Sequence, residues 1–378
     1  MPDIRLHSKI EEIPKEDWNA LCGNDYPFLR HEFLDALERS GSVTAKAGWQ
    51  PVHLSIWQDD ALIGVMPLYL KSHSWGEYVF DWSWADAWSR NGLDYYPKLL
   101  TAIPFTPATG PRFGIKLPEN ESIALLSQAL QQIAERFDAS GWHGLFIEPR
   151  LRETCEQNGL MTRLGTQYHW FNRNYQSFDH YLEHFTSRKR KNLRKEREKV
   201  ARQGVSLTTL EGSEITESHL DQFYNFYQLT YLKRGRQGYL TREFFTLLRE
   251  SLPEHLVLVI AEHEQHPVAG ALSLKSSDCL YGRYWGCLDE FDSLHFETCY
   301  YQGIDYCIRK GLQRFDPGAQ GEHKIQRGFE PVETWSAHWL RESGFHPALR
   351  NFLAEEQELL REEMLRLAQG LPFRQSDN

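Results

Sequence analysis

Residues 256–286 read LVLVIAEHEQHPVAGALSLKSSDCLYGRYWG and contain three short apolar runs. The runs at 256–262 and 268–275 are rich in β-branched and aliphatic residues, and a short polar turn separates them, which predicts a β-hairpin. A third strand is expected at 280–286. The stretch therefore predicts an antiparallel meander at the centre of the second half of the chain.

Helical patterns surround this meander. The segments 217–233 and 242–250 precede it, and the segment 296–310 follows it. The first half repeats this order, with helical patterns before a strand meander and an amphipathic helix at 123–138 after it. No residue-level repeat accompanies the repeated order. The expected fold class is mixed α/β, with two tandem lobes that each contain a mostly antiparallel sheet flanked by helices.

The boundary between the lobes is expected near a basic segment. Residues 188–202 read RKRKNLRKEREKVAR, which is strongly helical in composition. We expect an N-terminal lobe at 1–185, a basic connector helix at 186–204 and a C-terminal lobe at 205–378. The basic run from Arg188 to Arg202 can contact tRNA, a lipid-linked diphosphate or an anionic surface, and it can equally be a solvated helix face.

Composition narrows the class of protein. The formal net charge of −10 excludes a uniformly basic nucleic-acid surface, although it permits a local basic patch. The N-terminus lacks the cationic and apolar pattern of a signal peptide, and no apolar run reaches the roughly 18–20 residues that span a bilayer. The six cysteines form no CxxC pair. A cytoplasmic protein without an integral membrane contact is expected.

Several short motifs carry a family resemblance. They are Thr109-Gly110-Pro111-Arg112, Arg283-Tyr284-Trp285-Gly286, Leu294-His295-Phe296-Glu297, Tyr300-Tyr301-Gln302-Gly303, the run PGAQGEHK at 317–324, and Arg327-Gly328-Phe329. Together they resemble the FemAB-like branch of the GNAT N-acyltransferase superfamily, a group linked to peptidoglycan biosynthesis or recognition. The resemblance implies two tandem GNAT-like lobes with the active site in the second lobe.

The resemblance also implies a reaction class. Fem-type relatives transfer an aminoacyl group from tRNA to the amine of a cell-wall precursor, whereas ordinary GNAT enzymes use acetyl-CoA. In those enzymes a basic, glycine-rich loop holds the CoA diphosphate, and here the equivalent residues 287–293 contain three carboxylates and no glycine. Such a loop repels a diphosphate, which argues against acetyl-CoA. No cofactor is assigned, and the acyl donor, aminoacyl-tRNA or acyl-CoA, stays open.

Acyl transfer to an amine needs a proton acceptor and groups that stabilise an oxyanion. Glu322 and His323 follow a Pro-Gly strand exit and open a predicted helical turn, so either residue can be the base. Lys324 and Arg327 add positive charge at the same turn. Each of these residues also has a purely structural interpretation, as a first-turn helix acid, a packed ring or a surface base.

Further candidates lie on the predicted helix at 296–310 and on the strand before it. Glu297 and Tyr301 are four residues apart and share a helix face, so the pair can align the substrate amine or protonate the leaving group. It can equally be a tyrosine hydroxyl satisfied by a local carboxylate. Only one of Tyr284 and Trp285 can face a cleft, because neighbours on a strand alternate. The expected substrate contacts are Arg112, Arg283, Tyr284, Tyr300, Gln302, Gln320, Lys324, Arg327 and His338.

The function that these residues predict is N-acyl or aminoacyl transfer to an amine. Two alternatives stay open, a non-catalytic module that recognises a cell-wall peptide and a CoA-dependent N-acetyltransferase. The sixteen histidines show no zinc-site spacing, so no metal site is predicted. The aromatic stretch 75–88 can line a cleft if it is a strand, but core packing is the more common use of such residues.

Overall fold

A computed structural model of the chain describes residues 2–233, 235–319 and 321–374. The N-terminal unit consists of Met1–Thr166 and Glu333–Glu362, and the C-terminal unit consists of Gln167–Val332 and Glu363–Asn378. The expected connector at 186–204 therefore lies inside the C-terminal unit. The boundaries differ from the predicted lobes because residues 333–340 belong to a strand of the N-terminal unit, a long-range pairing that local sequence patterns do not contain.

Among its described residues, the N-terminal unit contains strands of two sheets, five complete helices and most of a sixth helix, α12 (His346–Ala368). One sheet has the strand order β1-β3-β4-β7, and the other has the order β15-β8-β6-β5-β2. The strands are β1 (Asp3–His7), β2 (Trp49–Pro51), β3 (His53–Gln58), β4 (Ala61–Met66), β5 (Tyr69–Lys71), β6 (Lys98–Thr101), β7 (Gly114–Ile115), β8 (Gly141–Ile147) and most of β15 (Glu330–Leu340). The helices are α1 (Lys15–Cys22), α2 (His31–Arg39), α3 (Trp82–Arg90), α4 (Glu119–Arg136) and α5 (Leu151–Gln157).

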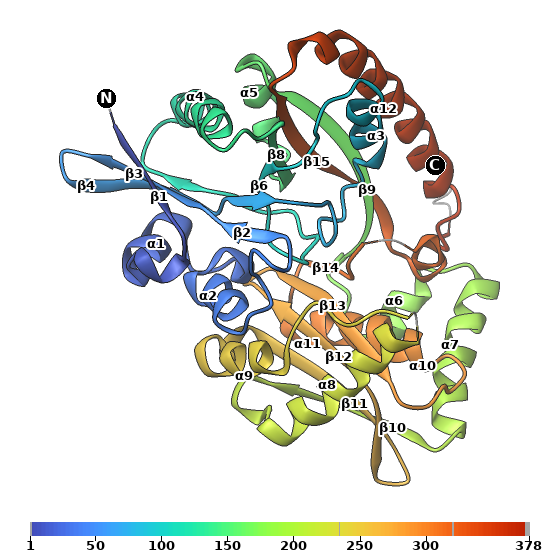
Figure 1. Cartoon of the computed structure of the whole chain (residues 1–378). Helices are drawn as coiled ribbons and strands as arrows, with labels where there is room; N and C mark the ends of the chain where they lie inside the picture. The colour runs from blue at the N-terminus through green and yellow to red at the C-terminus, as the bar shows by residue number, and fades with distance from the viewer. Residues whose placement is uncertain (1, 234, 320, 375–378) are drawn as a thin grey trace. The chain divides into compact units, whose positions relative to one another are not determined.

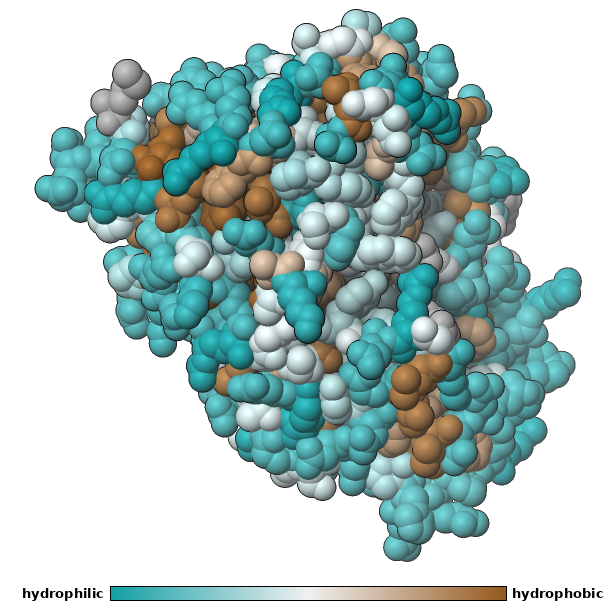
Figure 2. Space-filling view, in the orientation of Figure 1, coloured by the Kyte–Doolittle hydropathy of each residue, from teal (hydrophilic) through white to brown (hydrophobic). Residues whose placement is uncertain are grey.

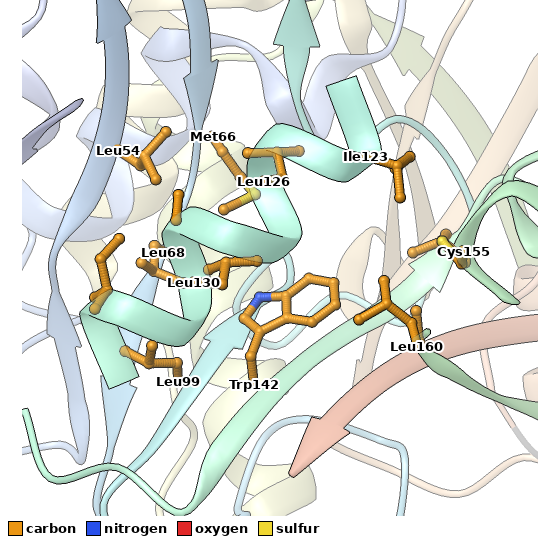
Figure 3. Packing of buried hydrophobic residues seen from close by; sticks show 14 of the residues in the cluster. Leu54, Met66, Leu68, Leu99, Ile123, Leu126, Leu130, Trp142, Cys155 and Leu160 are labelled. Carbon is orange, nitrogen blue, oxygen red and sulfur yellow. The ribbon is translucent and has the colours of Figure 1, made fainter. Parts of the chain in front are cut away.

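Helix α4 packs its apolar face into a hydrophobic core of this unit. Figure 3 shows Ile123, Leu126 and Leu130 pointing from α4 toward the strands, where they meet Leu99 and Trp142. The three helix residues follow the spacing i, i+3, i+7, which places them on one face. The predicted amphipathic helix is confirmed, although it begins four residues earlier than expected.

The C-terminal unit contains one sheet with the strand order β10-β11-β12-β13-β14-β9. The pairing of β13 with β14 is parallel, and the other pairings are antiparallel. The strands are β9 (Met161–Phe171), β10 (Val205–Glu211), β11 (Leu256–His263), β12 (His266–Lys275), β13 (Cys279–Cys287) and β14 (Arg314–Asp316). The helices are α6 (Phe178–Glu183), α7 (Ser187–Arg202), α8 (Glu217–Leu232), α9 (Arg242–Ser251), α10 (Leu294–Phe296) and α11 (Gln302–Lys310), and α12 (His346–Ala368) follows β15 (Figure 1).

The predicted meander is confirmed as β11, β12 and β13, and helices pack on both faces of these strands. On β13 the ring of Tyr284 packs against Tyr227 of α8, with ring centroids 6.0 Å apart. The next residue, Trp285, faces the other way and packs against His295, at 5.3 Å. The fold class, mixed α/β with mostly antiparallel sheets flanked by helices, is therefore confirmed.

The aromatic stretch in the first half folds differently from the expectation. The stretch 75–88 is not a strand, because residues 76–81 form a loop and α3 begins at Trp82. Trp84 and Trp88 lie four residues apart on α3, and both are buried. Because aromatic residues are frequent in this stretch, their spacing fits the alternation of a strand as well as the 3.6-residue period of a helix.

The face of the molecule displayed in Figure 2 is mostly polar. Figure 2 shows hydrophilic residues over most of the displayed face, with hydrophobic residues in separate patches. Of the helices that the structure describes, none combines the length and the hydropathy that crossing a bilayer requires.

Helix α8 approaches β13 so closely that the sheet has no room for a side chain at Gly286. A Cβ atom there would lie 2.0 Å from the carbonyl oxygen of Phe226. We expect Gly286→Ala to reduce the free energy of unfolding by about 1–3 kcal/mol, because the helix must move away from the strand. Urea denaturation measures this change. Gly344→Ala is the matched control, since a Cβ at that position has open space, and an equal effect of both substitutions would contradict the packing argument.

Candidate functional site

The PGAQGEHK run leaves β14 and enters a short 3-10 helix, η6 (Glu322–Arg327). Gly321 and Gly328 flank this helix with φ angles of 112° and 80°, a backbone region that favours glycine. The turn buries Lys324 and Arg327 and leaves Glu322 and His323 exposed. One turn therefore contains two buried cationic side chains and two exposed side chains, a carboxylate and an imidazole, that can exchange protons.

Arg327 connects η6 to two other segments. Its Nη2 donates to both carboxylate oxygens of Glu196 on α7, at 3.0 Å each, and its Nε donates to the hydroxyl of Tyr301 at 3.0 Å. Tyr301 in turn donates to Glu196. The guanidinium carbon also lies 3.4 Å from the ring centre of Phe296. We call Glu196, Phe296, Tyr301 and Arg327 the Arg327 cluster.

His323 is held against this cluster from one side. Arg327 Nη1 donates to the backbone carbonyl of His323 at 2.9 Å, and the imidazole Nε2 lies 2.9 Å from the hydroxyl of Tyr300. Burial lowers the pKa of His323, and the positive charges of Arg327 and Lys324 lower it further. Burial raises the pKa of Tyr300. At neutral pH the pair is therefore an uncharged imidazole and an uncharged phenol in hydrogen-bond contact.

A π-helical turn, η5 (Glu297–Tyr301), precedes α11 and sets the direction of Glu297 and Tyr301. Because hydrogen bonds in a π turn connect residues five apart, Gln302 lies over Glu297 and donates to it at 2.8 Å. The other partner of Glu297 is Arg197, whose Nη2 donates at 2.9 Å. The expected Glu297–Tyr301 pair does not form, since Tyr301 contacts Glu196 and Arg327 instead. Turns of this kind occur frequently at functional sites.

Arg283 and Lys324 lie around Asp316, at the end of β14. Arg283 Nη2 donates to Asp316 Oδ2 at 2.6 Å, and both side chains are almost completely buried. Arg283 and His169 help to hold the pKa of Asp316 well below its usual range, although burial alone would raise it. Lys324 Nζ donates to the carbonyl of Gly318 at 2.8 Å, and burial lowers its pKa to about 8.

The structure brings most of the predicted C-terminal residues into this region, namely Arg283, Glu297, Tyr300, Tyr301, Gln302, His323, Lys324 and Arg327. Tyr284 instead packs in the core against Tyr227 and Phe245. Glu322 is exposed. Gln320 lies outside the described residues.

Two further predicted residues belong to the N-terminal unit. Arg112 is buried and donates to backbone carbonyls, including Leu145 O at 2.7 Å and Gly110 O at 3.1 Å. His338 is buried on β15, with its Nδ1 2.8 Å from Nδ1 of His143. Both side chains have structural partners within their own unit, so neither contributes to the Arg327 cluster.

Sequence reasoning missed four residues of the region, Glu196, Arg197, Asp316 and His169. The acidic Glu196 interrupts a run of basic residues, and that interruption is the signal that could have identified it. Asp316 is the last residue of a predicted strand, where a carboxylate often has a specific partner, but its partner Arg283 is 33 residues away. Within the described residues, no group of three or more His, Cys, Asp or Glu side chains can hold a metal ion.

The sequence matches a known protein family, and the fold is similar to that of solved structures. A family model described as FemAB-like, peptidoglycan biosynthesis/recognition, matches residues 9–375. The crystal structure of FemX is similar to the chain with a TM-score of 0.54 and 13% identity, covering 92% of this chain and 100% of FemX. No protein with a curated description matches the chain in sequence.

Two further structures are similar to the chain over most of their length. The C-terminal domain of an Agrobacterium fabrum protein assigned as a lysylphosphatidylglycerol synthetase gives a TM-score of 0.55 at 11% identity, covering 90% of this chain and 95% of that one. L-PGS from Bacillus licheniformis gives 0.50 at 11% identity, with coverages of 91% and 97%. At these identities the similarity establishes the fold.

The environment of Lys324 predicts a pH-dependent stability. Because the folded-state pKa of about 8 lies below the reference value of 10.5, the unfolded chain binds more protons between these values, and stability rises with pH. Relative to Lys324→Met, the free energy of unfolding of the wild-type protein should rise by about 2 kcal/mol between about pH 7.5 and about pH 9.5. Urea titrations at both pH values measure this difference. A difference that does not change with pH would show that Lys324 titrates as an exposed lysine.

Proposed function

Because the chain belongs to the FemAB-like family, we propose that it transfers an aminoacyl group from aminoacyl-tRNA to the amine of a cell-wall peptide precursor, with His323 as the base. The observation that supports this most directly is the contact of an exposed, uncharged imidazole with Tyr300, beside the cations Lys324 and Arg327. The donor and the acceptor are both cytoplasmic molecules. The family and the fold support a transferase of the aminoacyl or acyl class.

The chemistry follows from the positions of these groups. The acceptor amine attacks the ester carbon of the aminoacyl group, a C–N bond forms, and the C–O bond to the tRNA ribose breaks. When His323 donates its Nε2–H to the Tyr300 oxygen, its Nδ1 lone pair is available for a proton of the attacking amine. That proton then goes to the departing ribose oxygen. No cofactor is needed, since the ester already contains the activated acyl group.

Lys324 and Arg327 support the reaction without touching the substrate in this proposal. Both side chains are buried and donate to protein oxygens. Their charges favour the uncharged imidazole, which is the form that can accept a proton, and they favour the oxyanion of the tetrahedral intermediate. Arg327 also fixes the backbone of His323, so it is a positioning residue for the base.

Helix α7 supplies a surface that fits the polyanionic donor. Arg188, Lys191, Lys195, Lys199 and Arg202 are all exposed, and their spacings of three and four residues place them on one face of the helix. We call these five residues the basic stripe. Lys199 pairs with Asp292 and Arg202 pairs with Glu198. A stripe of this kind follows a phosphate backbone, and neutralised phosphates make binding dependent on salt.

The loop at 287–293 favours this donor over acyl-CoA. Asp289 and Glu290 are exposed in the loop, and Asp292 binds Lys199 of the basic stripe. Glu290 pairs with Lys233 and Asp292 pairs with Lys199, so a diphosphate placed here would have to compete with two carboxylates for these cations and would also meet the charge of Asp289.

His323 and Glu322 can be separated as candidate bases by matched substitutions. We expect His323→Ala to lower kcat/KM by about 10²–10⁴-fold, the usual contribution of a general base. Glu322→Gln should change kcat/KM by only a few fold, because Glu322 is exposed and outside the Arg327 cluster. The measurement is transfer of radiolabelled aminoacyl groups from a mixed pool of charged tRNAs to a peptide precursor with a free amine. The reverse order of effects would make Glu322 the base, and binding without transfer would favour a recognition module.

The basic stripe makes a separate prediction about the donor. Replacing Lys191 and Lys195 by Gln should weaken tRNA binding and reduce the slope of log Kd against log salt by roughly 0.7–0.9 for each phosphate that the protein no longer neutralises. The matched control is Arg194→Gln, which removes one positive charge of α7 that does not belong to the basic stripe and is already paired with Asp179. An equal weakening of tRNA binding by substitutions at all three positions would indicate nonspecific attraction to the helix.

A further inference from the structure

The N-terminal unit contains a pair of buried lysines with an unusual arrangement. Strands β5 and β6 pair antiparallel with Lys71 directly opposite Lys98, so both side chains leave the same face of the sheet. Both residues are fully buried. Like charges directly opposite each other destabilise a sheet, and a buried ammonium group needs a hydrogen-bonded counter-charge. When both lysines are protonated, the pair therefore requires a partner that carries about two negative charges.

The segment between Lys71 and α3 provides that charge. Residues 72–81, here called the strap, place Glu77 Oε2 2.7 Å and Asp81 Oδ2 2.5 Å from Lys98 Nζ. Glu77 also lies near the second lysine, with Oε1 3.8 Å from Lys71 Nζ. One carboxylate therefore lies between the two ammonium groups, and the other contacts only Lys98.

The carboxylates fit this place incompletely. Glu77 Oε1 and Asp81 Oδ1 are buried without a hydrogen-bond partner among the described residues. Buried polar atoms in proteins nearly always have one. Burial lowers the pKa of Lys71 to about 7 and raises the pKa of Glu77 to about 7. The attraction between the two groups therefore does not offset the cost of burying their charges. Lys98 donates to Ser74, Glu77 and Asp81, and Lys71 donates to the carbonyl of Trp75 at 3.3 Å. The strap therefore matches the lysines in charge, but its carboxylates do not match them in hydrogen-bond geometry.

The strap and the start of α3 expose large aromatic side chains, while the acids of the strap are buried. Its two acids are buried, whereas Trp75, Phe80 and the first residue of α3, Trp82, are 46%, 53% and 39% exposed. This reverses the usual preference of acids for water and of large aromatic rings for the interior. The contacts of the two lysines with the acids therefore hold the strap in place together with backbone contacts, such as that of Arg163 with the carbonyl of Phe80 at 2.7 Å.

We propose that Lys71 and Lys98 form a binding site for a phosphoryl dianion in the N-terminal unit, and that Glu77 and Asp81 occupy this site in the present structure. A phosphate ester carries about −1.5 to −2 charges near neutral pH, which equals the charge of the two acids. Its three terminal oxygens can accept from both lysines and from Tyr95, whose hydroxyl donates to Asp81 at 2.7 Å. A single carboxylate ligand carries one charge and would leave one lysine uncompensated.

The site is separate from the Arg327 cluster and does not depend on the proposed transfer reaction. Binding of the dianion would release Glu77 and Asp81 into water, where carboxylates are well solvated. The alternative is a permanent ionic anchor for the strap. The two differ in their response to an added anion.

Inorganic pyrophosphate is a suitable probe, with the dicarboxylate succinate as a second arm. Calorimetric titration of the full-length protein should show weak binding of pyrophosphate, because the strap competes for the lysines. Glu77→Gln removes one competing charge at nearly constant shape, and we expect the Kd for pyrophosphate to fall by about tenfold. Glu121→Gln is the matched control, because Glu121 is an exposed acid of the same unit, and it should leave the Kd unchanged.

Two further measurements connect the effect to the lysines and the strap. Adding Lys71→Met to Glu77→Gln should return the Kd to at least the wild-type value. Hydrogen exchange of residues 72–81 should become faster when pyrophosphate saturates the protein. An unchanged Kd in Glu77→Gln, or unchanged exchange of residues 72–81 at saturation, would overturn the proposal and identify the cluster as a permanent anchor. Equal gains for succinate and pyrophosphate would overturn its assignment to phosphoryl groups.

Discussion

The buried guanidinium of Arg327 is the contact on which the candidate site depends. Within one side chain it joins η6, α7 and the π turn, through His323, Glu196 and Tyr301. A buried cation without a partner is strongly destabilising, so these segments can adopt this arrangement only together. The exposed imidazole of His323 gains its fixed position from this requirement, because its own backbone carbonyl is one of the acceptors. The exposed His323 is thus held in position by the buried side chain of Arg327.

Helix α7 shows how one segment can serve both parts. Its composition is basic, yet the two neighbouring residues that face the site are one acid, Glu196, and one base, Arg197. Glu196 compensates Arg327, and Arg197 compensates Glu297 at 2.9 Å and Asp305 at 2.8 Å. The other basic residues of α7 include the five exposed residues of the basic stripe. The basic composition of α7 therefore accounts for its exposed face, whereas its contacts with the candidate site depend on Glu196 and Arg197.

Local patterns in the sequence predicted many of the elements but not their partners. The hairpin of β11 and β12, the strand β14 and the turn η6 follow from apolar runs and turn residues that lie close together in the chain. The π turn is different, because it changes the partner of Glu297 from Tyr301 to Gln302 without a clear sequence signal. The pairing of β15 with β8 joins His338 to His143, which lie 195 residues apart. Such contacts arise from packing of the whole unit, so spacing along the chain does not reveal them. The same limit applies to the candidate site, where Arg112, Tyr284 and His338 carry suitable chemical groups but have structural partners elsewhere.

The choice of cation distinguishes the permanent contacts from those that can exchange. Arg283 and Arg327 each make several directed hydrogen bonds to a carboxylate, as a planar guanidinium allows, and a guanidinium stays charged when it is buried. Lys71 and Lys324 instead hold a compact charge on a flexible stem, and burial lowers the pKa of both. A lysine in that condition can lose its proton or change its partner with little rearrangement of the backbone. The arginines are therefore suited to fixing the architecture, and the two lysines are suited to responding to pH or to an incoming anion.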